Sequence, residues 1–297
     1  MRAAVIALAL AAAVSTAAPA SAADTALSDD GLGRVGLKVT GLTSDQRLVQ
    51  FPVNRPRDVR PIGAVSGLTP DTALVGIDYR VQDGRLYGVG DLGGIYTLNT
   101  STAQATKVSQ LTIPLFGALF GVDFNPAANR LRIISDTGQN LRHNIDDPSA
   151  PLVTISDGTL TNPIVPPSTA LGVTGAAYTN NDLNPATATT LFDIDTNNDR
   201  VAIQSPANAG TLAPTGDLGL DVGPSAGFDI YYWPKSGANQ GYAALRSNGS
   251  YGFYRVDILD GVATNLGAFP SDRQVVDVAL PLNQRKIYDV MLPLNQR

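Results

Sequence analysis

The 297-residue sequence predicts an all-β fold, namely a single β-propeller of five four-stranded blades. Three observations predict it. All 26 acidic residues are aspartate and only four residues are lysine, so most of the residues that cover solvent-facing helices are absent. A short motif recurs at intervals of 45 to 54 residues, which is the length of a propeller blade. The two ends of the chain carry three strands and one strand, which together make a further blade.

The first 22 residues have the features of a signal peptide. Arg2 gives a positive start, residues 3–14 are apolar, and Ala20, Ser21 and Ala22 form the small-x-small pattern that precedes cleavage. The apolar run is too short to span a bilayer, and no later segment is long and apolar enough to do so. We expect cleavage after Ala22, a flexible segment over residues 23–34, and a secreted protein (or a periplasmic one in a cell with two membranes).

The propeller is expected to occupy residues 35–284. Its N-terminal part contains three short runs of alternating apolar and polar residues, which predict strands at 37–40, 47–51 and 59–65. Three strands are one fewer than a blade needs.

Four complete units follow, at about residues 72–110, 119–158, 172–218 and 225–270. Each opens with a Gly-led motif whose third residue is Asp or Ala; its starts are Gly76, Gly121, Gly175 and Gly227. A second motif ends in Asn or Asp and is assigned to the third strand of each unit; it covers residues 95–99, 140–144, 191–195 and 253–257. Pairs such as Asn248-Gly249 between alternating runs predict hairpins, because both turn residues take positive φ.

The closing strand is expected at residues 274–280, where Val276-Asp277-Val278 resembles the first motif without its Gly. Joined to the three N-terminal strands, it completes a fifth blade and leaves no unpaired edge in the ring. A six-bladed ring and an open β-sandwich are the alternatives. The Pro-rich residues 161–169 are expected to form a long surface loop between blades.

Residues 285–297 form a C-terminal extension that duplicates the segment before it. Residues 277–285 and 289–297 are identical at eight of nine positions, with Met291 in place of Ala279. Both copies begin like strands and are stopped by Pro, so both compete for the closing position. We expect the first copy to occupy the closing position, because residues 274–276 then keep their pairing with the neighbouring strand and a small Ala lies in the sheet.

The segments Gly121–Pro126 and Arg130–Arg142 carry a resemblance to a known family. Together with residues 85–89, 95–99 and 241–246, they resemble secreted bacterial proteins grouped as domain of unknown function number 4394. The resemblance covers about residues 35–284. It implies a propeller-like repeat fold and export from the cell, and it transfers no catalytic residue because the family has no established activity.

The Asp of the first motif is the most specific candidate site. It recurs as Asp78, Asp123, Asp229 and Asp277, while the unit at Gly175 has Ala177. The first strand of each blade lines the channel, so these carboxylates are expected at one height around the axis. Like charges there must be paired, protonated or bridged by a cation, and Ca²⁺ prefers such hard oxygen ligands. The alternative is that each Asp accepts backbone N–H bonds or pairs with an Arg of the next blade.

Two other polar features favour structural interpretations. The spacing of a calcium-binding loop is seen in the alternating residues Asp193, Asp195, Asn197 and Asp199. Asn198, however, stands where such a loop has Gly, and Gln204 stands where it has a bidentate Glu, so a hairpin turn is favoured. His143 aligns with Leu98, Ile194 and Val256, apolar positions of the third strands, so a packed, hydrogen-bonded His is expected.

A candidate ligand-binding segment contains the only Trp. Tyr232 and Trp233 lead into a loop that contains Asn239, and aromatic rings beside amides are suited to sugar faces. The alternative is a strand end whose rings pack between blades.

Composition limits the possible chemistry. The absence of cysteine and the single histidine exclude the usual zinc sites, cysteine nucleophiles and disulfides. A net charge of −5 without Lys/Arg clusters disfavours nucleic acid and anionic membranes. The favoured function is a non-catalytic extracellular binding or scaffold protein, a monomer whose partner is a small molecule, glycan or protein. The alternative is an Asp-dependent hydrolase or lyase of an extracellular polymer. Beyond a Ca²⁺ ion no cofactor is predicted, and no catalytic residue is assigned.

Overall fold

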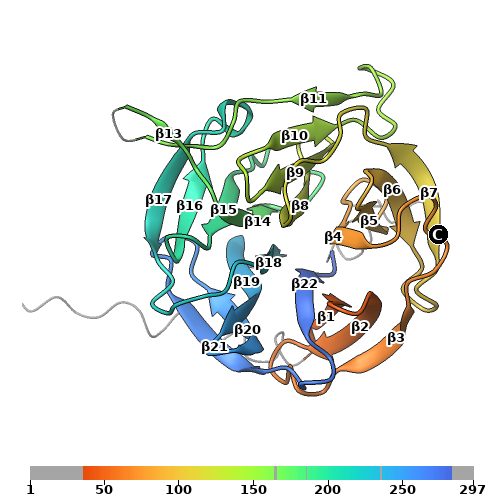
Figure 1. Cartoon of the computed structure of the whole chain (residues 1–297), viewed down its shortest axis with the longest axis vertical. Coiled ribbons are helices and arrows are strands. Elements are labelled where there is room, and N and C mark those ends of the chain that lie inside the picture. Colours follow the sequence, from red (N-terminus) through yellow and green to blue (C-terminus); the bar gives the residue numbers. More distant parts are fainter. Residues whose placement is uncertain (1–35, 164–165, 185, 235, 283–297) are drawn as a thin grey trace, which may run out of the picture.

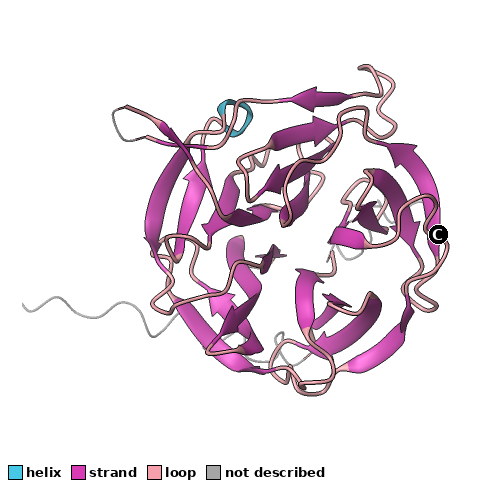
Figure 2. Cartoon of the chain, viewed as in Figure 1, coloured by secondary structure: helices cyan, strands magenta, loops and turns pink. Residues whose placement is uncertain are grey.

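The computed structural model describes residues 36–163, 166–184, 186–234 and 236–282, which form a five-bladed β-propeller (Figure 1). The predicted signal peptide (1–22), the segment 23–34 and the C-terminal extension (285–297) lie outside the described residues. Strands dominate; the single helical element of the described residues is a 3₁₀ turn, η1 (Ala207–Ala209) (Figure 2). Within those residues there is no helix of the length and apolarity that a membrane crossing requires.

Four blades are continuous in sequence, and each is an antiparallel sheet whose strands follow chain order. They consist of β4 (Leu74–Tyr79), β5 (Leu86–Gly90), β6 (Gly94–Leu98) and β7 (Ala105–Gln110); β8 (Phe120–Asn125), β9 (Arg130–Ser135), β10 (Asn140–His143) and β11 (Thr154–Ser156); β14 (Val173–Tyr178), β15 (Leu191–Asp195), β16 (Arg200–Gln204) and β17 (Leu212–Asp217); and β18 (Ala226–Trp233), β19 (Ala238–Ser247), β20 (Ser250–Val256) and β21 (Ala263–Ala268). The predicted units agree with these bounds within a few residues.

The fifth blade joins the two ends of the chain, as predicted. Its order is β22 (Val275–Ala279), β1 (Lys38–Thr43), β2 (Arg47–Pro52) and β3 (Arg60–Ala64). β22 pairs antiparallel with β1, with Gly41 opposite Val278, and it occupies the innermost position. The ring is therefore closed by hydrogen bonds between the first and last described strands, which excludes the six-bladed and open-sandwich alternatives.

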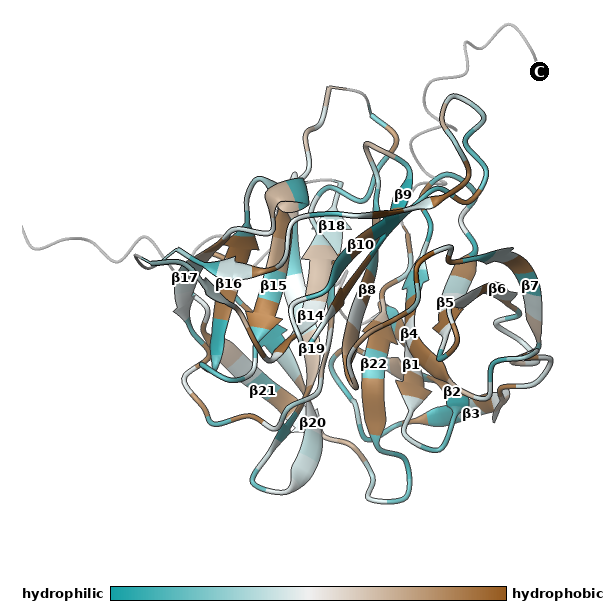
Figure 3. Cartoon of the chain, turned by 45° about the horizontal axis from the view of Figure 1, so that its top comes forward, coloured by the Kyte–Doolittle hydropathy of each residue, from teal (hydrophilic) through white to brown (hydrophobic). Residues whose placement is uncertain are grey.

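Burial decreases from the axis outward. The innermost strand β14 is buried at all six positions, whereas the outermost strands β7 and β17 are largely exposed and carry Thr, Lys, Pro and Asp. Figure 3 shows apolar and polar bands alternating along the strands. Polar residues on the outer strands suit an edge that faces water and must not pair with another chain.

The recurrent Gly allows the innermost strands to approach one another. A Cβ added to Gly76 would lie 2.5 Å from Cγ2 of Val122 in the next blade, and one added to Gly227 would lie 2.4 Å from Cα of Asp277. Neighbouring blades converge toward the axis, so only Gly fits where their backbones are closest. In the closing blade Val275 takes this place, beside Gly41, where an added Cβ would lie 2.8 Å from Cγ1 of Val275.

The hydrophobic core is divided into five clusters, each between two adjacent blades. The cluster beside the closing blade is the most aromatic; there the Phe51 and Phe253 rings meet edge to face with centroids 5.0 Å apart. Each blade is thus held by apolar packing against both neighbours, and the channel keeps a fixed geometry.

One sequence prediction of local structure was wrong. Residues 191–195 form β15, the second strand of their blade, and the third strand is β16. The motif was misassigned because the connection from β14 to β15 is long and the strand ends in Asp like the third strands. The predicted surface loop at residues 161–169 contains a small hairpin, in which β12 (Thr161–Asn162) pairs with β13 (Ser168–Thr169).

Candidate functional site

The central channel opens as a pocket of about 270 Å³ at the end where the innermost strands begin. All five of these strands contribute to its wall, through Leu74, Phe120, Thr174, Ala226 and Val276. Asp277 also lines the pocket. This mouth leads toward the ring of repeated aspartates.

The repeated Asp residues lie on the innermost strands, as the motif predicted. Asp78 is on β4, Asp123 on β8, Asp229 on β18 and Asp277 on β22. The first three are buried, with at most 4% of their surface exposed, and Asp277 is half-buried. The fifth inner strand, β14, has the buried Ala177 at the equivalent position.

Each of these carboxylates accepts a backbone hydrogen bond from the next blade around the ring. Asp78 Oδ2 accepts from the Phe124 N–H at 2.8 Å, Asp123 Oδ1 from the Tyr178 N–H at 3.3 Å, Asp229 Oδ2 from the Leu280 N–H at 2.5 Å and Asp277 Oδ2 from the Ile77 N–H at 2.8 Å. These bonds connect adjacent blades near the axis. Backbone capping, the alternative expected from the sequence, is therefore one role of these four residues, which we call the Asp ring.

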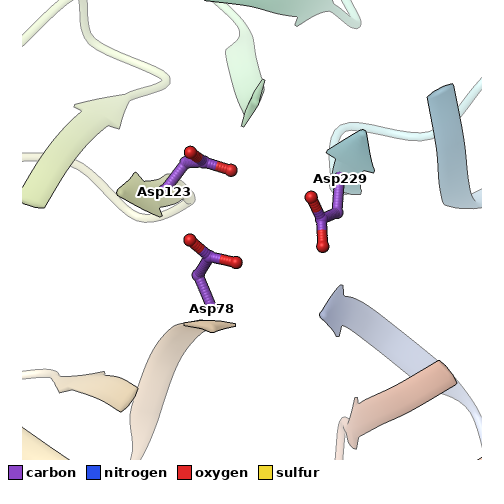
Figure 4. A group of neighbouring side chains, drawn as sticks. All are labelled: Asp78, Asp123 and Asp229. Atoms are coloured by element: carbon purple, nitrogen blue, oxygen red, sulfur yellow. The ribbon is translucent and has the colours of Figure 1, made fainter. Parts of the chain in front are cut away.

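Three of the carboxylates also converge. One oxygen each of Asp78, Asp123 and Asp229 lies within 4.8 Å of the other two (Figure 4). Asp277 is not in this group. Asp123 Oδ2 is buried and has no hydrogen-bond partner, and among the described residues none of the four aspartates forms an ion pair. The cluster thus combines three carboxyl groups with unused acceptor capacity.

Burial dominates the electrostatics of the ring. Burial, and next the nearby Asp229 charge, raise the pKa of Asp78 well above its usual value; burial and then the Asp78 charge do the same to the pKa of Asp123. Burial raises the pKa of Asp229 to about 7 and that of Asp277 to about 8. Without a cation, the ring therefore retains protons near neutral pH. A cation would replace those protons.

Two of the other polar candidates, Asp195 and His143, have structural environments, whereas Asp193 is fully buried and neither of its carboxyl oxygens has a hydrogen-bond partner among the described residues. Asp195 accepts hydrogen bonds from the Asn198 backbone and Arg200 within a hairpin turn, as expected. His143 is fully buried, with Nε2 2.8 Å from Ser109 Oγ and Nδ1 3.0 Å from Thr154 Oγ1, and burial lowers its pKa to about 4. A neutral, fully bonded imidazole of this kind is not poised for proton transfer.

The aromatic segment lies at the end of β18. Trp233 is 9% exposed and belongs to the core beside the closing blade, where its ring meets Tyr231 edge to face. Tyr232 is half-buried and pairs in register with Asn239 on β19, whose side chain exchanges hydrogen bonds with Asn180. The face of Trp233 is packed inside the protein, and ligand binding at Tyr232 and Asn239 stays a prediction.

One polar cluster was missed in the sequence. Arg130, Arg132 and Arg142 line a pocket between two blades. The alternation of Arg130 and Arg132 in one strand was visible as a signal, because alternate residues share a face. Their convergence with residues of the next blade could not be predicted, since it depends on contacts between residues distant in sequence.

Comparison with known proteins gives a family and a fold likeness. The family model described as "Domain of unknown function (DUF4394)" matches residues 47–279. No curated protein matches this chain.

Several solved structures are similar in fold at low identity. An auxiliary nutrient binding protein from Bacteroides thetaiotaomicron is 12% identical, with a TM-score of 0.41 over 73% of this chain and 59% of that one. An auxiliary nutrient binding protein from Bacteroides ovatus is 13% identical, with a TM-score of 0.40 over 74% and 56%. Myxococcus xanthus glutaminyl cyclase is 11% identical, with a TM-score of 0.41 over 74% and 95%. This chain covers less than two thirds of the two Bacteroides proteins.

Proposed function

The chain belongs to the DUF4394 family of domains of unknown function, and from this premise we propose that it is an exported, non-catalytic binding or scaffold protein with one Ca²⁺ ion in its central channel. Asp78, Asp123 and Asp229 would hold the ion. The single observation that carries the proposal is the convergence of these three buried carboxylates without an ion-pair partner among the described residues.

The three converging oxygens leave a position that one cation can share, since each lies within 4.8 Å of the other two. The carboxylate-only set also matches the preference of Ca²⁺ for hard oxygen ligands.

Existing hydrogen bonds do not compete with coordination. A carboxylate oxygen has two lone pairs, so one that accepts a backbone N–H can still face an ion. Asp123 Oδ2 has no such bond at all. The ion would add a second connection between blades already linked by these carboxylates, and the pocket at the channel mouth would give it a route from solvent.

The pattern of pKa values favours binding over catalysis. Paired catalytic carboxyls have environments that push their pKa values apart, so that one acts as acid and the other as base. Here burial raises the pKa of all four ring aspartates in the same direction. The Asp-dependent hydrolase or lyase has close carboxyls with raised pKa in its favour, but it lacks the divergent acid and base pair that such catalysis requires.

The test compares thermal unfolding of the mature protein in CaCl₂ and in EDTA. At a calcium concentration a hundredfold above the dissociation constant, the ion adds about 2.7 kcal/mol, equivalent to a Tm increase of about 5–10 °C. The double variant Asp78→Asn/Asp229→Asn should lose this difference. Asp221→Asn, which changes an exposed aspartate that is not part of the ring, is the matched control and should retain it.

Equal melting of the parent protein in calcium and EDTA would overturn the calcium proposal. Export is tested separately. The expected result is a mature N-terminus at Ala23 in protein recovered from outside the cytoplasm, and a retained, uncleaved chain would contradict it.

A further inference from the structure

Two adjacent strands of one blade place arginines close together. Arg132 on β9 lies directly opposite Arg142 on β10 in the antiparallel register. Like charges at directly opposite positions destabilise a sheet unless they are compensated. Asp157 compensates both, accepting from Arg132 Nη1 at 2.7 Å and from Arg142 Nε at 3.0 Å.

A third arginine joins them. Arg130 is two residues before Arg132 and therefore on the same face of β9. Its Nη1 donates to Asp147 Oδ2 at 2.9 Å. Three guanidinium groups thus face the carboxylates of Asp157 and Asp147. Asp193 is a third acid near Arg132, but burial raises its pKa well above the usual value; with Asp193 protonated, the cluster keeps one net positive charge.

Some donors of this cluster are unused by the described part of the protein. Arg132 is almost completely engaged, bonding Tyr178 Oη, Asn140 and Asn208 as well as Asp157. By contrast, Arg142 donates only through Nε, so both of its Nη groups have no described protein acceptor.

Arg80 shows the difference between this cluster and a structural arginine. Its Nε and Nη2 bond Asn129, while Nη1 and Nη2 bond both oxygens of Asp146 and Nη1 also bonds Tyr87. Every nitrogen of that guanidinium has a protein acceptor. Arg142 does not have an acceptor for each of its guanidinium nitrogens, although its side chain is only 33% exposed.

The three arginines line a pocket of about 90 Å³ between the blade of β8–β11 and the blade of β14–β17. The remaining wall is polar, formed by Tyr178 and the amides of Asn125 and Asn208, with Ala128 as the apolar part. This volume has room for several water molecules, and therefore for one small oxyanion. We call these residues the arginine pocket.

We propose that the arginine pocket binds the carboxylate group of a small organic acid. Guanidinium groups present planar pairs of donors that match a carboxylate. The net charge of the cluster is balanced by one negative charge, which favours a carboxylate over doubly charged phosphate. The remaining part of the acid would extend past Ala128 and Arg142 to solvent. This site has the opposite charge to the Asp ring and does not depend on bound calcium.

The test is a titration of ¹⁵N-labelled protein with sodium acetate at constant ionic strength, following the arginine Nε–Hε signals by NMR. We expect saturable shifts of the Arg132 and Arg142 signals. Acetamide, the neutral analogue, should cause none. Arg142→Gln should weaken acetate binding by about tenfold or more, since charge-assisted hydrogen bonds are lost.

Arg130→Gln is a second variant that keeps the Arg142–Asp157 contact, and weaker binding is expected there too. Arg57→Gln is the control, because it removes one exposed positive charge outside the pocket. An equal loss in Arg57→Gln would show non-specific charge attraction and would overturn the proposal. Absence of saturable shifts, or saturation by inorganic phosphate but not acetate, would overturn it as well.

Discussion

The pH dependence of unfolding of the metal-free protein follows from the buried Asp ring. The pKa of Asp229 is raised from 3.8 to about 7 and that of Asp277 to about 8, so the folded state binds protons that the unfolded state releases. The stability that such groups contribute is fully present below their pKa in the unfolded state, and it is lost as pH rises through their pKa in the folded state. The metal-free protein should therefore become less stable between pH 4 and pH 8.

His143 has the opposite effect in the lower part of this range. Its pKa falls from 6.5 to about 4 in the fold, so its contribution is lost as pH falls from 6.5 to 4. Above pH 7 the imidazole is mostly neutral in both states and changes the stability by only about 0.1 kcal/mol. The interval from pH 7 to 8 therefore reports mainly the carboxyls.

The expected change is measurable. Integrating proton binding by Asp229 and Asp277 from pH 7 to 8 gives a loss of about 1.4 kcal/mol in the free energy of unfolding. Protons that Asp78 and Asp123 retain would add to it. With calcium at saturation the proposed ligands Asp78, Asp123 and Asp229 would be ionised in the fold, so their part of this dependence should vanish while that of Asp277 stays.

The assay is urea unfolding at pH 7 and 8, in EDTA and in CaCl₂. Asp277→Asn should reduce the loss in EDTA, whereas Asp221→Asn should not change it. Equal or greater stability at pH 8 than at pH 7 in EDTA would refute the reasoning that burial raises these pKa values.

The remaining predictions concern closure and packing. Truncation after Phe269 removes β22 and should abolish cooperative unfolding, because the stabilising free energy lost with buried Val275, Val278 and Leu280 exceeds about 5 kcal/mol. Thermal unfolding followed by circular dichroism checks this, and a cooperative transition near the parent Tm would contradict it. Val278→Asp should be similarly severe, since it places a charge in the core. Deletion of residues 286–297 should change the free energy of unfolding by less than about 0.5 kcal/mol, as measured by urea unfolding. In the full chain, the Val275–Ala279 amides should be protected from hydrogen exchange. Protection of residues 290–292 with free exchange at β22 would reverse this interpretation. Gly227→Ala should cost several kcal/mol, because its Cβ would overlap the backbone of Asp277, while Gly223→Ala should cost much less; equal Tm values for the two variants would contradict the packing argument.

The sequence predicted the architecture because the Gly-led motif recurs at blade spacing. Gly76 and Gly227 mark points where inner strands nearly touch, so the motif reports a constraint of the ring and not merely a strand. Counting three strands at one end and one at the other predicted the closing blade. The position of residues 191–195 could not be predicted in the same way, since Asp or Asn stands at or just after the end of second strands as well as of third strands, as at Asp136 and Asn144.

The site was predictable in part. Equivalent positions predicted that Asp78, Asp123 and Asp229 would converge, but not that Asp277 would lie outside the group of three. Asp229 bonds the N–H of Leu280, three residues after Asp277, whereas Asp78 bonds that of Phe124, directly after Asp123. Such offsets depend on how adjacent blades are positioned, and a periodic sequence pattern does not contain that information.

The most direct test of the central claim is the calcium content of the folded protein. Native mass spectrometry with elemental analysis should find one calcium per chain in the mature protein, none after EDTA treatment, and none in Asp78→Asn/Asp229→Asn. Asp221→Asn should retain the full calcium content. A folded mature protein that contains no calcium after equilibration with millimolar CaCl₂ would contradict the account and leave the Asp ring as a protonated, hydrogen-bonded link between blades.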